Sequence, residues 1–160
     1  SRRFNIDYFN FGFSGNALGE KTMADYIAAL PMSLFFLDFD HNSPNAEHLK
    51  AHHESFFLNI REKNPDLPVI MATKTDIPRS PAAEKSNAAH RAVVYETYEN
   101  AVKRGDRNVI FIDGATVFSK ALTLSAPADS CTVDGCHPND LGFACMAKVF
   151  GDAIEKMLGL

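Results

Sequence analysis

Four short runs of mostly apolar residues alternate with longer amphipathic segments along the chain. These runs cover residues 6–11, 34–37, 69–72 and 109–112, and in the last three every position is apolar. A strand that helices cover on both faces is apolar throughout, whereas a half-exposed strand alternates between apolar and polar residues. The runs therefore predict four strands, of which the last three are buried.

Apolar residues at every third or fourth position separate the runs and predict helices. The clearest helix covers residues 46–63. Its apolar face carries Leu49, His53, Phe56, Phe57 and Ile60. Further helices are predicted over residues 21–30, 82–103 and about 139–158, and an irregular stretch over 119–137 precedes the last of them.

This alternation of strands and helices predicts the fold class. Strands that are separated by helices form a parallel sheet with helices on both faces. We predict one α/β domain over residues 1–160, built as three layers, α/β/α, around that sheet. In such sheets ligands bind beyond the carboxyl ends of the strands. Three polar clusters lie at such ends or before a helix, at residues 12–20, 38–42 and 134–137.

Composition and charge restrict the class of protein. The 160 residues are 46% hydrophobic and 22% charged, which is typical of a globular domain and not of a disordered or coiled-coil chain. The net charge of −4 lacks the basic field that attracts nucleic acid. The apolar runs are far shorter than the ~20 residues of a membrane helix. We therefore predict a small-molecule ligand, with no nucleic-acid and no membrane partner.

Three cysteines, Cys131, Cys136 and Cys145, contain no Cys-x-x-Cys pair. A zinc site built from them is therefore not predicted, and neither is a disulfide framework on which the fold depends. Their spacing leaves a bond between Cys131 and Cys136 across one loop open.

The segment Asp134-Gly135-Cys136-His137-Pro138 is the sharpest chemical signal. An aspartate three residues before a histidine can accept a hydrogen bond from the imidazole Nδ1–H, which leaves Nε2 free as a general base. We predict that Asp134 and His137 form this pair at about 2.6–3.2 Å. The alternative is that Asp134 caps the last helix beside a surface histidine, although Asn139 can also fill that role.

Residues 12–16, Gly-Phe-Ser-Gly-Asn, lie between a predicted strand and a predicted helix. Ser14 could be a nucleophile on a strand–turn–helix elbow, although that pattern has glycine where Asn16 stands. The backbone amide of Gly15 could instead stabilise an oxyanion, because glycine allows close approach to the backbone. An ordinary turn before a helix is the third interpretation.

Residues 38–42, Asp-Phe-Asp-His-Asn, follow a predicted strand. Asp40 and His41 could bind a metal ion, whereas the neutral amide of Asn42 is suited to donate a hydrogen bond to an oxyanion. Turn formation, with Asn45 capping the next helix, explains the same residues without chemistry.

The other histidines are weaker candidates. His48 and His52 have the i, i+4 spacing of a metal clamp but lack the adjacent glutamate of a metalloprotease motif. His53 falls on an apolar helix face and is predicted to be a core residue, while His90 is predicted on a helix surface. We predict no metal site here and no cofactor.

Taken in order, three segments resemble sequence blocks of the SGNH (GDSL-like) hydrolase family. YFNFGFSGN (residues 8–16) is similar to the second block, LFFLDFDHN (34–42) to the third, and DGCHPNDLGF (134–143) to the fifth. The resemblance implies a flavodoxin-like fold with three layers around a five-stranded parallel sheet. It also implies a serine esterase mechanism.

Site roles follow from the same resemblance. His137 would be the general base, and Asp134 the carboxylate that orients it. Gly15 and Asn42 would be oxyanion-hole donors. The third block departs from the family's usual G-x-N-D, because Asp40 and His41 precede the asparagine.

The family's first block, which carries the nucleophilic serine, has no counterpart in residues 1–160. In this alignment Ser14 belongs to the oxyanion block, so the nucleophile and the first strand of the sheet are expected upstream of Ser1. That strand would lie between the predicted strands at 6–11 and 34–37. An upstream segment or a second copy of the chain is expected to fill the position.

Three functions are consistent with these residues. The favoured one is a serine ester hydrolase that removes short acyl groups from a small ester, for example an acylated carbohydrate. The second is a non-catalytic domain of the same family that binds a ligand or partner. The third is a metal-dependent phosphoesterase that uses Asp40, His41 and His137.

Overall fold

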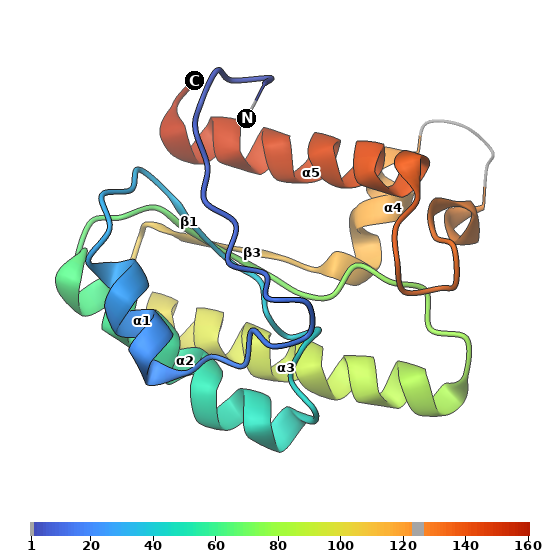
Figure 1. Ribbon diagram of the computed structural model, residues 1–160, viewed down its shortest axis with the longest axis horizontal. Helices are drawn as coiled ribbons and strands as arrows, with labels where there is room; N and C mark the ends of the chain where they lie inside the picture. The colour runs from blue at the N-terminus through green and yellow to red at the C-terminus, as the bar shows by residue number, and fades with distance from the viewer. Residues whose placement is uncertain (1, 123–126) are drawn as a thin grey trace.

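The computed structural model describes residues 2–122 and 127–160, and helices alternate with strands along it (Figure 1). Residues 123–126 of the expected irregular stretch lie outside this description. No helix in the described part is long and apolar enough to cross a membrane. The helices are α1 (Lys21–Ala28), α2 (Ala46–Lys63), α3 (Pro81–Lys103), α4 (Val117–Ala121) and α5 (Asp140–Leu158). The strands are β1 (Phe35–Leu37), β2 (Val69–Ala72) and β3 (Val109–Ile112), and the 3₁₀ turns are η1 (Gly114–Thr116) and η2 (Ala128–Cys131).

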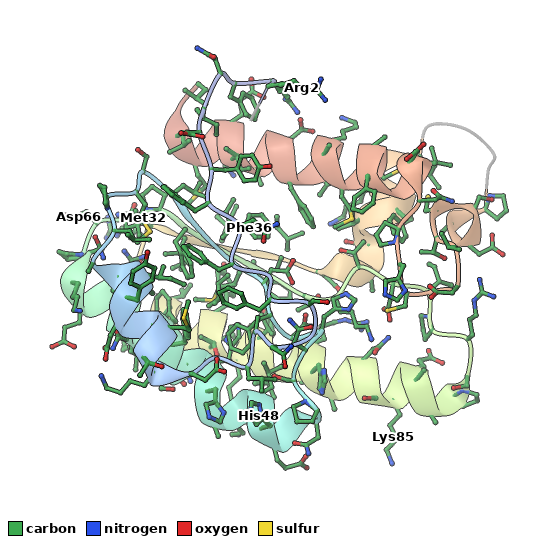
Figure 2. The ribbon with its side chains drawn as sticks, in the orientation of Figure 1. Arg2, Met32, Phe36, His48, Asp66 and Lys85 are labelled. Atoms are coloured by element: carbon green, nitrogen blue, oxygen red, sulfur yellow. The ribbon has the colours of Figure 1, made fainter. Side chains whose placement is uncertain are left out.

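The strands form one parallel sheet in the order β1–β2–β3. Helices α1, α2 and α3 cover one face, and α4 and α5 cover the other (Figure 1). Phe36 points from β1 toward α5, where its ring lies 5.0 Å from that of Phe150 (Figure 2). Every residue of β2 is buried, as its apolar sequence predicts for a strand covered on both faces. The predicted α/β class with three layers is confirmed.

Side chains before the helices determine where they begin. Asn45 caps α2 by accepting a hydrogen bond from the amide of His48 at 2.8 Å, and Ser80 caps α3 in the same way. Asn139 caps α5 by accepting from the amide of Gly142 at 3.1 Å. The caps predicted at Asn45 and Asn139 are therefore confirmed.

The strand predicted at residues 6–11 is wrong, because this segment pairs with no strand in the described structure. The segment crosses the molecule between α5 and α1 (Figure 1). Together with β1 it lines a groove of about 1180 Å³. Neighbouring strands must lie about 4.8 Å apart to form hydrogen bonds. The groove separates the backbone of residues 6–11 from that of β1 by more than this distance, so the two do not pair. Aromatic packing holds the segment instead, since the ring of Phe11 lies 6.1 Å from Tyr26, edge to face.

Candidate active site

The loops at the carboxyl edge of the sheet are joined to one another by hydrogen bonds. The carboxylate of Asp40, after β1, accepts from the amide of Lys74, after β2, at 2.9 Å. The amide of Ile77 in turn donates to the carbonyl of Gly135, in the loop before α5, at 2.7 Å. These contacts place the polar clusters after β1 and before α5 on either side of the loop that follows β2.

Asp134 and His137 form a close pair within the loop before α5. The Nδ1–H of His137 donates to Oδ2 of Asp134 at 2.7 Å, which confirms the predicted distance. Oδ1 of Asp134 accepts from the amides of Cys136 at 2.9 Å and His137 at 2.8 Å. These hydrogen bonds, above all that from the His137 backbone, hold the pKa of Asp134 well below its usual range. Asp134 is therefore a fixed anion that orients the imidazole, and Asn139 caps the helix in its place.

The turn between these two residues depends on Gly135. Its φ of +92° lies in the left-handed region that favours glycine. A Cβ on Gly135 would lie 2.6 Å from Nε of Arg79 and 2.8 Å from the carbonyl oxygen of Ile77. The loop after β2 therefore packs directly against the backbone that carries the Asp134–His137 pair.

Asn42 and Asp38 line the groove at the end of β1. Asp38 is open to solvent in the groove, but the surrounding protein raises its pKa to about 7, with a smaller contribution from the charge of Asp40. The surrounding protein also lowers the pKa of His41 to about 4 although its side chain is exposed, and the charge of Lys74 contributes to this shift.

Gly15 and Ser14 lie in an exposed turn, both with positive φ, at +88° and +51°. Asn16 holds this turn by donating from Nδ2 to the carbonyl of Phe13 at 3.1 Å. Phe13 lines the same groove as Asn42, whereas Gly15 does not. Between the described residues no hydrogen bond joins Ser14 to His137. The roles assigned to Gly15 and Ser14 remain predictions.

Comparisons with known proteins agree with the fold of the chain. Residues 1–155 match the model of the GDSL-like Lipase/Acylhydrolase family. The chain belongs to this family. Its members are hydrolases of the esterase and lipase type, and the membership accounts for the parallel sheet flanked by helices. A comparison with curated proteins found no match.

Two solved structures resemble this GDSL-like chain. A GDSL-like lipase from Bacteroides ovatus shares 28% identity, with a TM-score of 0.78 over 91% of this chain and 42% of the other. The salicylyl-acyltransferase SsfX3 from a tetracycline biosynthetic pathway shares 23% identity, with a TM-score of 0.62 over 86% and 40%, and shows the fold alone. The chain thus spans less than half the length of each of these proteins.

Asp40 in the GDSL-like chain, for which the sequence left a metal-binding role open, accepts a hydrogen bond from the backbone amide of Lys74. It is 1% exposed, and burial raises its pKa to about 6 although the Lys74 amide donates to it. Across residues 2–122 and 127–160, no three His, Cys, Asp or Glu side chains are arranged to hold a metal ion. Asp40 therefore joins the loops after β1 and β2.

His90 is buried, at 7% exposure, so its predicted surface position is wrong. It lies on the face of α3 that packs against the domain. Six residues of α3 are buried on this face, namely Asn87, His90, Val93, Val94, Thr97 and Ala101, and all of them except Val93 follow a heptad-like spacing. Sequence reasoning missed the face because three of its members are polar, although the spacing of 3, 4, 3 and 4 residues could have identified it.

The histidines of α2 lie apart from the groove. His53 is fully buried, and its Nδ1 lies 2.9 Å from Oγ1 of Thr97, which confirms a core position. His48 and His52 stack with ring centroids 4.2 Å apart, and neither lines the groove. Figure 2 shows His48 on α2. Nδ1 of His52 lies 2.8 Å from the carbonyl oxygen of His48, a contact within the helix.

Replacing Gly135 with alanine is expected to lower the free energy of unfolding by about 2–4 kcal/mol, from backbone strain and displacement of the loop after β2. Gly105 is a matched control, because its φ is +88° but a Cβ there would meet nothing within 4 Å. Gly105→Ala should cost only about 1–2 kcal/mol. Urea unfolding of both variants measures the difference, and equal losses would show that Gly135 is not closely packed.

Proposed function

We propose that the protein is a serine ester hydrolase in which His137 is the general base and Asp134 orients it. The 2.7 Å contact between His137 Nδ1 and a carboxylate fixed by two backbone amides carries this proposal. In a Ser-His-Asp triad the carboxylate holds the imidazole tautomer whose Nε2 accepts the serine proton. Nε2 of His137 has no hydrogen-bond partner among the described residues, and its side chain is 78% exposed. It is therefore accessible to a nucleophile.

In this proposal the nucleophilic serine belongs to a segment upstream of Ser1. That segment forms a strand in the groove beside β1 and ends near Asn42 and His137. Three features support this position. In the described sheet β1 pairs only with β2, so its other edge is free. The groove runs along that edge, and residues 6–13 line the opposite side of the groove. A strand in the groove would satisfy the unpaired backbone groups of β1.

The reaction then follows two steps. Serine attacks the ester carbonyl while His137 takes its proton, and the alcohol leaves with that proton as the acyl-enzyme forms. Water, deprotonated by His137, attacks the acyl-enzyme and releases the acid and the free serine. The side-chain amide of Asn42 and the backbone amide of Gly15 donate hydrogen bonds to the oxyanion that forms in each step.

We propose a short acyl group on a polar alcohol such as a carbohydrate. A strand in the groove would cover the apolar side chains that a long acyl chain would otherwise contact. The groups at the end of β1 are polar, since Asp38 and Asn42 line the groove there and His41 lies between them in the sequence. A small polar site of this kind suits a short acyl group.

Hydrolysis of p-nitrophenyl acetate by the full-length protein tests the proposal. We expect turnover of the acetate and a lower kcat/KM for the octanoate. Asn42→Ala should lower kcat by roughly 10²–10³, because one oxyanion donor is lost. Asn100→Ala is the matched control, because Asn100 lies on α3 outside the groove and donates to Glu54 of α2 at 2.9 Å. A folded full-length protein without turnover would favour the non-catalytic alternative.

A further inference from the structure

We infer that Cys131 and Cys145 form an intramolecular disulfide in an oxidising environment, and that this bond ties the Asp134–His137 loop to α5. Both thiols are buried, at 0% and 5% exposure, and their Sγ atoms lie 4.0 Å apart. The inference is independent of the proposed function, because it rests on the positions of the two sulfur atoms.

The backbones that carry the two cysteines are already held together by other contacts. Cys131 ends η2, and its carbonyl accepts from the amide of Asn139 at 3.0 Å. Gly142, on the first turn of α5, allows this approach, since a Cβ there would lie 2.1 Å from the same carbonyl oxygen. A disulfide has an S–S distance near 2.05 Å, so the sulfurs must move closer by about 2 Å through side-chain rotation.

Cys136 is not the partner of Cys131, although the sequence left that pairing open. It is partly exposed, and its backbone amide donates to Oδ1 of Asp134. Within the described structure the sulfur of Cys131 contacts that of Cys145, and both belong to the core between β3 and α5. The third cysteine thus provides an internal control.

The oxidation balances with glutathione disulfide as the oxidant. The thiolate of one cysteine attacks glutathione disulfide and releases one glutathione thiol, leaving a mixed disulfide. The second cysteine attacks that mixed disulfide, forms the Cys131–Cys145 bond and releases the second glutathione. Two protein thiols lose two protons and two electrons, and glutathione disulfide becomes two thiols.

Burial determines when this exchange occurs. It raises the pKa of Cys131 to about 11, and the adjacent Cys145 contributes to the shift. Because the thiolate is the attacking species, exchange is slow in the folded protein and fast while the chain is still folding. The bond therefore forms during folding.

Refolding the full-length protein in reduced and oxidised glutathione, followed by alkylation and peptide mapping, tests the inference. We expect Cys136 to be alkylated, and the peptides of Cys131 and Cys145 to be cross-linked. Dithiothreitol should lower the midpoint of thermal unfolding by about 6–12 °C, because the bond closes a loop of about 15 residues. Hydrogen exchange at residues 132–137 should be slower in the oxidised form.

Two variants complete the test. Cys136→Ser should retain the cross-link and the effect of dithiothreitol, whereas Cys145→Ser should lose both. If Cys145→Ser fails to fold, the comparison of the wild type with and without reductant still decides. Alkylation of both Cys131 and Cys145 after oxidative refolding, or a cross-link to Cys136, would overturn the inference.

Discussion

Asp134→Asn in the full-length enzyme is expected to lower kcat by roughly 10³–10⁴, with little change in KM. Asparagine can keep its place in the loop, but its amide cannot stabilise the imidazolium that forms when His137 takes the serine proton. It also favours the tautomer in which Nε2 carries the proton, so the base is blocked. Steady-state hydrolysis of p-nitrophenyl acetate measures the loss.

Asp140→Asn is the control for this experiment, because Asp140 is an exposed aspartate at the start of α5 and makes no hydrogen bond with its side chain in the described structure. It should retain nearly full turnover. His137→Ala should lose as much as Asp134→Asn or more, and combining the two changes should add little, since the residues act as a unit. Near-normal turnover of Asp134→Asn would refute the assigned role of this carboxylate.

The second large effect concerns the position of the nucleophile. A fluorophosphonate probe, which reacts with activated serines, should label the full-length protein upstream of Ser1 and leave residues 1–160 unlabelled. Peptide mapping of the labelled protein locates the serine. Labelling should disappear in His137→Ala, because the serine then has no base to accept its proton.

Ser14→Ala separates the two candidate positions. Ser14 is in an exposed turn with no described hydrogen bond to His137, so we expect this variant to keep both labelling and turnover. Labelling at Ser14 itself would place the nucleophile inside the chain. The groove beside β1 would then require another explanation.

The sequence predicted best those features that depend on neighbours along the chain. The apolar runs identified β1, β2 and β3, and the pattern of residues 46–63 matches the bounds of α2. Spacing alone also predicted the hydrogen bond between Asp134 and His137, because three residues can form a turn that brings the side chains together. The resemblance to GDSL-like hydrolases added the candidate roles of Gly15 and Asn42.

Predictions failed where the outcome depends on segments that are distant in sequence. Residues 6–11 have the composition of a strand, but a strand also needs an adjacent partner, and a groove lies beside β1. His90 was expected at the surface because polarity was taken as exposure, whereas α3 places it against the domain. In both cases the packing of other elements overrode the local signal.

The sequence by itself determined the three-layer class, the helix caps and the Asp134–His137 pair, because periodicity, capping and short spacing act within a few residues. Only the tertiary structure decided that Gly135 packs against the loop after β2 and that Cys131 meets Cys145. It also decided that a groove separates residues 6–13 from β1. These features join parts of the chain whose distance is set by how helices and loops pack on the sheet, and no local pattern encodes that distance.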